Sequence, residues 1–251
     1  MNNKTLHIIG NEFTRNIAHS DDWWIHRLGI YEHYCLASLK NQTNKNFLLM
    51  MTLNYVPIEF QKKIKHILDA SELQYVLRNF TETSLAETLS QFRDKYDTVY
   101  HTRIDSDDMF HKTVVDEIQS YGIHERKALI FQKGYCYDCR NNRLQHYFMP
   151  SPPFSTIIYP MSIYLDEAKQ QEYKNFKSHD SLCGAMPYKV LSENKFIVNV
   201  HGTNRITIYQ NDRTIFKGHE NETEIPFTGI DRVINDFGIS SDTYKNNIVH
   251  I

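Results

Sequence analysis

Apolar residues in the first 105 positions follow two different spacings. Short, nearly continuous apolar runs predict buried strands, and apolar residues at every third or fourth position predict helices. The predicted strands cover residues 6–10, 47–53, 73–77 and 99–104. The predicted helices cover residues 24–39, a stretch that begins just after Pro57, and residues 83–96. This alternation favours a mainly parallel sheet with right-handed crossovers, in which ligands bind beyond the carboxyl ends of the strands.

The pattern changes in the second half of the chain. Short strand candidates separated by turn residues cover residues 128–132, 135–137, 144–148 and 156–159, and a later strand covers 196–200. Helices are predicted over 163–176 and 230–237, and a hairpin around 206–216. We therefore expect an α/β fold, a Rossmann-like and mainly parallel sheet flanked by helices, with a smaller mixed C-terminal part. The expected domain covers residues 1–205, and an extension over 206–251 packs on it.

The composition is that of an ordinary globular domain. The chain has 251 residues, 41% of them hydrophobic, which is enough to bury a full core. The net charge is −2 and no basic stripe occurs, so we expect no nucleic-acid partner. No apolar run approaches the roughly 20 residues of a membrane span, and the order of a signal peptide is missing. We expect a cytoplasmic protein, or one working at the inner membrane surface, with free cysteine thiols.

The candidate chemistry lies in three aspartates, Asp105, Asp107 and Asp108, directly after the predicted strand over 99–104. Three carboxylates within four residues repel one another, and their burial without partners costs several kcal/mol. A divalent cation at this point explains the pattern. Oxygen ligands suit Mg²⁺ or Mn²⁺, and these ions suit a phosphate-bearing substrate.

Other interpretations of the aspartate cluster differ in how well they fit. A calcium-binding EF-hand loop fails, because Phe110 stands in place of the required glycine and Asp116 in place of the closing glutamate. A phosphatase with an aspartate nucleophile also has Asp-x-Asp after a strand, but usually near the N-terminus and followed by Thr or Val. A solvated loop is a third alternative, with Asp108 capping a helix that starts near Phe110. The fourth is a nucleotide-sugar site, where a metal neutralises the departing diphosphate.

Several short segments resemble one family. Asp105-Ser106-Asp107-Asp108, after Thr102-Arg103-Ile104, resembles the DxD signature of GT-A glycosyltransferases. Three further pieces are similar, in order and spacing, to the putative rhamnosyltransferase family of that fold. They are a helix containing Arg27, the segment Leu36-Ala37-Ser38-Leu39-Lys40-Asn41-Gln42-Thr43, and Asn46-Phe47-Leu48-Leu49. The resemblance covers about residues 5–205 and implies a GT-A-like fold.

The resemblance also implies roles for individual residues. Asp107 and Asp105 are expected to hold Mg²⁺ or Mn²⁺, and His201, which follows the predicted strand 196–200, to complete the metal site. Arg103 and Asp105 are expected to face the nucleotide; an ion pair is the structural alternative for Arg103. Asn54 stands where many GT-A enzymes have an aspartate near the base or ribose, which is a departure from the pattern.

The acceptor side requires a base within hydrogen-bond reach of the attacking hydroxyl. His179-Asp180 lies in a polar turn, and a carboxylate is the common base of inverting transfer, so Asp180 is the first candidate and His179 the second. We expect a glycosyltransferase that moves rhamnose or another hexose from a nucleotide-sugar donor to a glycan or glycolipid acceptor. The rivals are a metal-dependent nucleotidyltransferase or phosphatase, and a carbohydrate-binding module without turnover.

Overall fold

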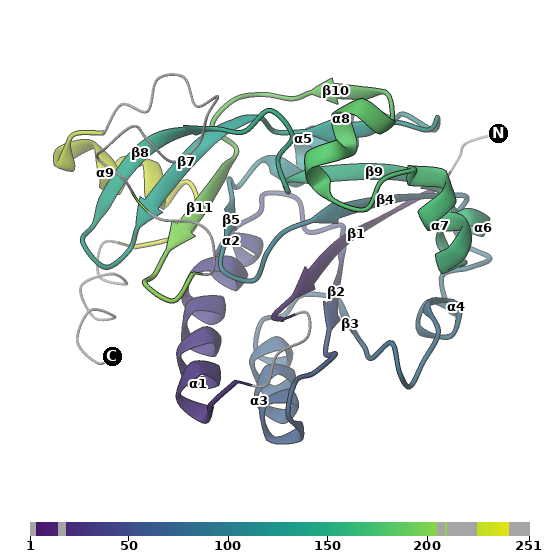
Figure 1. Ribbon diagram of the computed structural model, residues 1–251, viewed down its shortest axis with the longest axis horizontal. Coiled ribbons are helices and arrows are strands. Elements are labelled where there is room, and N and C mark those ends of the chain that lie inside the picture. Colours follow the sequence, from purple (N-terminus) through teal and green to yellow (C-terminus); the bar gives the residue numbers. More distant parts are fainter. Residues whose placement is uncertain (1–3, 15–18, 205–208, 210–224, 241–251) are drawn as a thin grey trace.

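The computed structural model describes residues 4–14, 19–204, 209 and 225–240. Two sheets form its framework (Figure 1). The larger has seven strands in the order β10-β6-β9-β4-β1-β2-β3. Their bounds are β1 Thr5–Glu12, β2 Leu48–Thr52, β3 Tyr75–Arg78, β4 Thr98–Arg103, β6 Ala128–Ile130, β9 Ser155–Pro160 and β10 Tyr188–Val190.

All pairings in the larger sheet are parallel except those of β9, which is antiparallel to β4 and β6. This confirms the expected GT-A-like α/β fold with a mainly parallel sheet. Because β9 runs against its neighbours, its first residues lie at the edge where β4 ends. Thr156 pairs with Thr102, so the segment that precedes Ser155 reaches the carboxyl edge of the sheet.

The smaller sheet has the order β5-β11-β7-β8, with bounds β5 Met109–Phe110, β7 Lys133–Asp138, β8 Arg143–Phe148 and β11 Phe196–Val200. β5 follows the aspartate cluster directly and pairs with β11, Phe110 opposite Phe196. The chain therefore leaves one sheet at the end of β4 and enters the other within a few residues. The aspartates lie at this junction.

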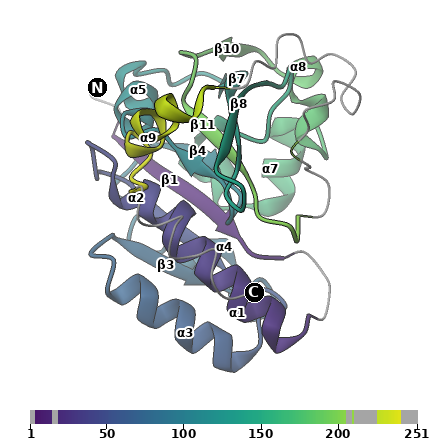
Figure 2. The ribbon, with the colours of Figure 1, turned by 90° about the vertical axis from the view of Figure 1, so that its left-hand side faces the viewer.

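Helices cover both faces of the larger sheet (Figures 1 and 2). Their bounds are α1 Asp21–Ile30, a π-helical turn η1 Tyr31–Leu36, α2 Ala37–Lys40, α3 Ile58–Asp69, α4 Leu85–Thr88, α5 Val114–Ser120, α6 Met161–Tyr164, α7 Glu167–Lys174, η2 His179–Ser181, α8 Leu182–Ala185 and α9 Phe227–Asn235. In both views α1 and α3 lie side by side, and Trp24 stacks on Phe60 between them. Ser20 caps α1 by accepting a hydrogen bond from Trp23 N.

The core follows the alternation of side chains along each strand. Ile9, Leu49 and Met51 belong to the buried cluster that includes Trp24 and Phe60. Ile8, Leu48 and Met50, one position earlier in each case, belong to the cluster on the other face. That second cluster also holds Tyr164 and Leu182 of α6 and α8. Both faces of the central strands are thus buried, which explains their nearly continuous apolar sequence.

The segment Leu36–Thr43, identified from the sequence, fixes the chain that follows the aspartates. Ser38 Oγ accepts a hydrogen bond from Phe110 N at 3.2 Å. Gln42 Oε1 accepts from Val115 N at 3.1 Å, and Gln42 Nε2 donates to His111 O at 2.9 Å. Thr43 Oγ1 donates to Lys112 O at 3.0 Å. These three side chains satisfy backbone groups of residues 110–115 and so hold β5 and the start of α5 in place.

Two helix predictions are wrong in extent. Residues 83–96 form only α4, with a capping box between Ser84 and Glu87, and then a series of turns. In these turns Phe92 N donates to Leu89 O and Lys95 N donates to Phe92 O, so the bonds join residues i and i−3. Leu85 and Leu89 still belong to the buried cluster on the sheet. Residues 163–176 divide between α6 and α7, because Asp166 caps a new helix. In contrast, the prediction over 24–39 is confirmed as the continuous run α1-η1-α2.

Several remaining predictions have clear outcomes. The strands predicted over 6–10, 47–53 and 99–104 correspond to β1, β2 and β4, and the one over 73–77 to β3. The hairpin around 206–216 lies outside the described residues, apart from Tyr209. α9 packs on the smaller sheet and on α1, since Ile230 and Ile234 belong to the cluster of Ile30 and Tyr137. None of the four cysteines, all of them among the described residues, forms a disulfide, and no helix in this part of the chain is long and apolar enough to cross a membrane.

A chain of polar side chains crosses the core beside β4. Gln119 Nε2 lies 3.1 Å from His7 Nδ1, His7 Nε2 lies 2.7 Å from Thr102 Oγ1, and Thr102 Oγ1 lies 2.6 Å from Thr156 Oγ1. Because the Gln119 amide nitrogen only donates, His7 Nδ1 accepts and Nε2 carries the proton. Burial, together with the nearby His101, lowers the pKa of His7 to about 3.

This pKa makes stability depend on pH. The unfolded chain takes up a proton at His7 near pH 6.5, whereas the folded chain does not, so stability falls as the pH drops from about 6.5 towards 3. We expect His7 alone to contribute a loss of about 1.4 kcal/mol per pH unit in the middle of this range. Urea unfolding of His7→Gln between pH 7 and 4.5 should show a flatter dependence. Gln119→Met keeps the imidazole and should keep the slope; equal slopes for His7→Gln and the original chain would contradict this explanation.

Candidate functional site

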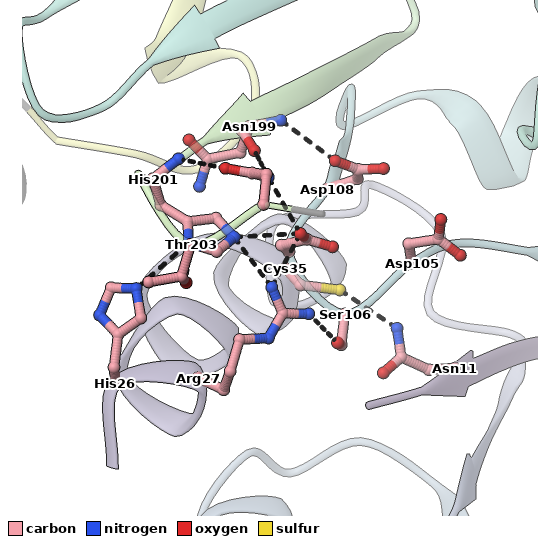
Figure 3. Close-up of polar contacts among 12 residues, drawn as sticks. Asn11, His26, Arg27, Cys35, Asp105, Ser106, Asp108, Asn199, His201 and Thr203 are labelled. Atoms are coloured by element: carbon pink, nitrogen blue, oxygen red, sulfur yellow. Dashed lines mark hydrogen bonds and ion pairs between the residues drawn. The ribbon is translucent and has the colours of Figure 1, made fainter. Parts of the chain in front are cut away.

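The aspartate cluster lies where three segments converge: α1, the turn between β4 and β5, and the turn after β11 (Figure 3). Parallel β4 and the strand β11 both end here. Ser106 and Asp107 come from the first turn, and His201 and Thr203 from the second. Arg27 of α1 points between them. The contacts among these side chains span up to 174 positions of the sequence.

Arg27 is the centre of the site, and it is 7% exposed. Its Nη1 donates to Asp107 Oδ2 at 2.8 Å and lies 2.9 Å from His201 Nε2. Its Nη2 donates to Ser106 Oγ at 2.7 Å. Its Nε–H is buried without an acceptor among the described residues. The guanidinium therefore binds both turns, and one of its donors is unsatisfied.

Asp107 is held as a carboxylate. Burial by itself opposes ionisation, but the charge of Arg27, its hydrogen bond and the neighbouring His201 outweigh it and hold the pKa of Asp107 well below its usual value. The oxygen Oδ2 accepts from Arg27 Nη1 at 2.8 Å and from Asn204 Nδ2 at 3.4 Å. The site thus contains a fixed negative charge at neutral pH.

Asp108 has a different character, although it is the next residue. It is 5% exposed, and its Oδ1 accepts a hydrogen bond from Asn199 N at 3.1 Å. Burial, and then the charges of Asp107 and Asp105, raise the pKa of Asp108 well above its usual value. The solvated-loop interpretation is therefore wrong: Asp108 joins β5 to β11 and caps no helix, since α5 begins at Val114.

Asp105 is the most exposed of the three aspartates, with 42% of its side chain accessible. Arg103 Nη2 donates to Asp105 Oδ1 at 2.8 Å, so the ion pair suggested for Arg103 is present. Asn54 is buried, and its Oδ1 accepts a hydrogen bond from Phe80 N at 3.0 Å, which joins the ends of β2 and β3. The described contacts of Asn54 do not reach the Asp107 cluster.

His201 is placed next to Asp107, as the resemblance implied: its Nε2 lies 3.1 Å from Asp107 Oδ2. On its other side, Nδ1 lies 3.0 Å from Thr203 Oγ1 and 3.1 Å from His26 Nε2. Its backbone N–H donates to Asn204 Oδ1 at 2.7 Å. Burial, followed by His201, Arg27 and Arg140, lowers the pKa of His26 to about 4, so His26 is neutral at pH 7.

His179 and Asp180 lie in η2, away from these contacts. His179 Nδ1 is 2.9 Å from Ser151 O and 3.2 Å from Asp180 Oδ1, and Asp180 has 75% of its side chain exposed. None of the described contacts joins either residue to Asp107 or His201. Their catalytic assignment stays a prediction.

The described residues contain no group of three or more His, Cys, Asp and Glu side chains arranged to hold a metal ion. Asp107 and His201 form a convergent pair, and Asp105 lies on the same turn with Arg103 as its partner. Mg²⁺ usually keeps several waters and takes only one or two carboxylates from the protein. The pair therefore fits as part of a cation site that substrate phosphates and water complete.

The sequence did not assign roles to several residues of the site. They are His26, Arg27, Ser106, Asn199, Thr203 and Asn204. Arg27 was noted as part of a familiar segment, yet its pairing with Asp107 depends on how two elements 80 positions apart pack. For Thr203 and Asn204, the signal in the sequence was their position just after His201, in the segment His201-Gly202-Thr203-Asn204.

The fold and this site define a GT-A-like α/β protein with a carboxylate–histidine pair at the carboxyl ends of its strands. A family profile described as "Putative rhamnosyl transferase" matches residues 6–210. The chain belongs to this family of glycosyltransferases. A sequence search of curated proteins finds no significant match.

Solved structures give more distant likenesses. The fragment 1–349 of S. aureus TarS in complex with UDP-GlcNAc is 13% identical, with a TM-score of 0.46; the match covers 80% of this chain and 60% of that one. The same fragment in complex with UDP is 14% identical, with a TM-score of 0.42. That match covers 78% of this chain and 60% of the fragment. A cytidylyltransferase from Leptospira borgpetersenii is 11% identical, with a TM-score of 0.40. The match covers 76% of this chain and 77% of the cytidylyltransferase. This chain thus spans about 60% of the TarS fragment, and at TM-scores below 0.5 none of these likenesses supports a functional conclusion.

The opposite pKa shifts of Asp107 and Asp108 can be tested by measuring how a substitution at each position changes the free energy of unfolding. Asp107→Asn leaves the Arg27 guanidinium buried without its counter-ion, and we expect a loss of about 3–5 kcal/mol in the free energy of unfolding. Asp108→Asn replaces a carboxyl group whose pKa is raised by burial with an amide of the same shape that can still accept from Asn199 N, and we expect a loss of under about 1.5 kcal/mol. Urea unfolding at pH 7 measures both. Equal losses would show that the two carboxyl groups do not differ as described.

Proposed function

We propose that the chain transfers a hexose, such as rhamnose, from a nucleotide diphosphate sugar to a hydroxyl group of a glycan or glycolipid. The observation that carries this proposal is the Asp107–His201 pair with Arg27 at the carboxyl ends of β4 and β11. The family match supports the reaction class. The TarS fragment was solved with UDP and with UDP-GlcNAc, and these two compounds are convenient first probes for a binding test.

The leaving diphosphate gains negative charge as the glycosidic bond breaks, so a site for this reaction needs positive charge at that point. We assign Mg²⁺ or Mn²⁺ to Asp107 and His201, with Asp105 as the further carboxylate of the turn. When bound, the ion supplies charge neutralisation at the leaving group. Asp107 suits this role because it is ionised at neutral pH, whereas the pKa of Asp108 is raised by burial and that group serves the fold.

The nucleotide is assigned to the same edge of the sheet. Arg103 lies at the end of β4 and pairs with the half-exposed Asp105, so both can turn towards a phosphate or ribose. The amide nitrogen of Asn54, at the end of β2, has no hydrogen-bond partner among the described residues, and Phe80 beside it is exposed. These residues support donor binding at the carboxyl ends of β2 and β4.

The acceptor base is assigned to Asp180, with His179 as the alternative. Support comes from the direction of β9: the residues before Ser155 reach the edge where β4 ends, and His179 contacts Ser151 there. The carboxylate of Asp180 is exposed, so it can approach a hydroxyl of an acceptor. It would take the proton of that hydroxyl as the oxygen attacks the anomeric carbon.

Donor binding tests the cation assignment. We expect UDP to bind at least about ten times more weakly in EDTA than in Mn²⁺, because the carboxylates repel phosphate until a cation intervenes. Isothermal titration calorimetry of the original chain and of Asp107→Asn measures this. The Mn²⁺ effect should be lost in Asp107→Asn. Equal UDP affinity with and without Mn²⁺ in the original chain would contradict the assignment.

Initial rates test the acceptor base. Asp180→Asn should lower kcat by roughly 10²–10⁴ and leave donor affinity nearly unchanged, since a general base acts on the acceptor proton. Asp166→Asn, at a helix cap with 40% of its side chain exposed, is a control outside the site that should retain kcat. Full activity of Asp180→Asn would move the assignment to His179.

A further inference from the structure

Three atoms at the centre of the site form a small triangle (Figure 3). Arg27 Nη1 lies 2.8 Å from Asp107 Oδ2 and 2.9 Å from His201 Nε2, and the latter two atoms are 3.1 Å apart. Each corner belongs to a different segment of the chain. The guanidinium nitrogen is thus equally close to a carboxylate oxygen and an imidazole nitrogen.

The protons of this triangle can be assigned. Arg27 Nη1 carries two N–H groups and accepts nothing, so one can point at Asp107 Oδ2 and the other at His201 Nε2. His201 Nε2 then accepts with its lone pair. In this tautomer the ring N–H is on Nδ1, 3.0 Å from Thr203 Oγ1 and 3.1 Å from His26 Nε2, either of which can accept it. Two lone pairs, one from oxygen and one from nitrogen, therefore face the same cationic nitrogen.

The distance between these two lone-pair atoms can also be compared with the distance between two adjacent ligand atoms of a metal ion. Adjacent ligand atoms of an octahedral Mg²⁺ ion, each about 2.1 Å from the ion and at right angles, lie about 3.0 Å from one another. Asp107 Oδ2 and His201 Nε2 are 3.1 Å apart. The positively charged Arg27 Nη1 stands on their shared side, where such an ion would be.

We propose that Arg27 is a built-in counter-cation that competes with the divalent ion for Asp107 and His201, so that metal binding displaces its guanidinium. The inference rests on the proposed function only in assigning a cation to Asp107. In the state described here the guanidinium compensates the buried carboxylate. Its hold is incomplete, because Arg27 Nε–H is buried without an acceptor among the described residues, and an unsatisfied buried donor is unfavourable.

Competition predicts that removing the guanidinium strengthens metal binding. We expect Arg27→Met to bind Mn²⁺ at least about ten times more tightly than the original chain, in the absence of any nucleotide. The free Mn²⁺ signal in electron paramagnetic resonance measures this affinity. Arg27→Met should also melt at a lower temperature in EDTA and recover by several degrees in Mn²⁺, because a ligand that binds only the folded state stabilises it.

Three variants serve as controls. Arg78→Met also removes a buried arginine that pairs with a carboxylate, that of Glu167 outside the site, and it should leave Mn²⁺ affinity as in the original chain. The double variant Arg27→Met with Asp107→Asn should lose the gain, because the oxygen ligand is then an amide. Arg27→Lys keeps a cation at the site and should bind Mn²⁺ more weakly than Arg27→Met.

Three results would overturn the proposal. They are a folded Arg27→Met with the Mn²⁺ affinity of the original chain, a gain that persists in the double variant, and an Arg27→Met that stays unfolded at every Mn²⁺ concentration. The last shows that metal cannot replace the guanidinium. These readouts involve no sugar: tight Mn²⁺ binding by Arg27→Met without turnover of any donor would refute the proposed function alone, and turnover together with any of the three results would refute this proposal alone.

Discussion

A buried guanidinium joins the two sheets of this protein. Arg27 contacts Ser106 and Asp107 at the end of the larger sheet and His201 at the end of the smaller one. Burying a charge is costly unless it is paired, so Arg27 and Asp107 each require the other. The positions of α1, of the aspartate turn and of the turn after β11 all depend on this pair. The site is therefore made by the same interaction that fixes how the sheets meet.

The helical run α1-η1-α2 is the frame of the site. Its first part carries Arg27 and His26, and its last part carries Ser38, which with Gln42 beyond it binds the backbone of residues 110–115. One continuous element thus binds the aspartate turn through its first part and β5 through its last part. The familiar segment Leu36–Thr43 is explained by this structural role, and it needs no contact with a substrate.

The sequence predicted most of the fold, because strands that are buried on both faces have nearly continuous apolar sequences. It failed at residues 83–96, where successive tight turns give the same apolar spacing as a helix. In the candidate site it selected Asp107 and, through the family resemblance, His201, and the structure brings these two residues together. It could not separate Asp107 from Asp108, since burial and the neighbouring Asn199 decide that difference. Nor could it pair Arg27 with Asp107, because no local pattern records the packing of distant elements.

The long sequence separations within the site also order its formation. Arg27 and Asp107 are 80 positions apart, whereas His201 is 174 positions after Arg27. During synthesis, Arg27 and Asp107 are therefore made well before His201, so the residues of the site become available in two stages. Contacts of such separation carry a large loop-closure entropy, which slows their formation. The three side chains can meet only after β11 has been made, so the site depends on nearly the whole length of the described domain.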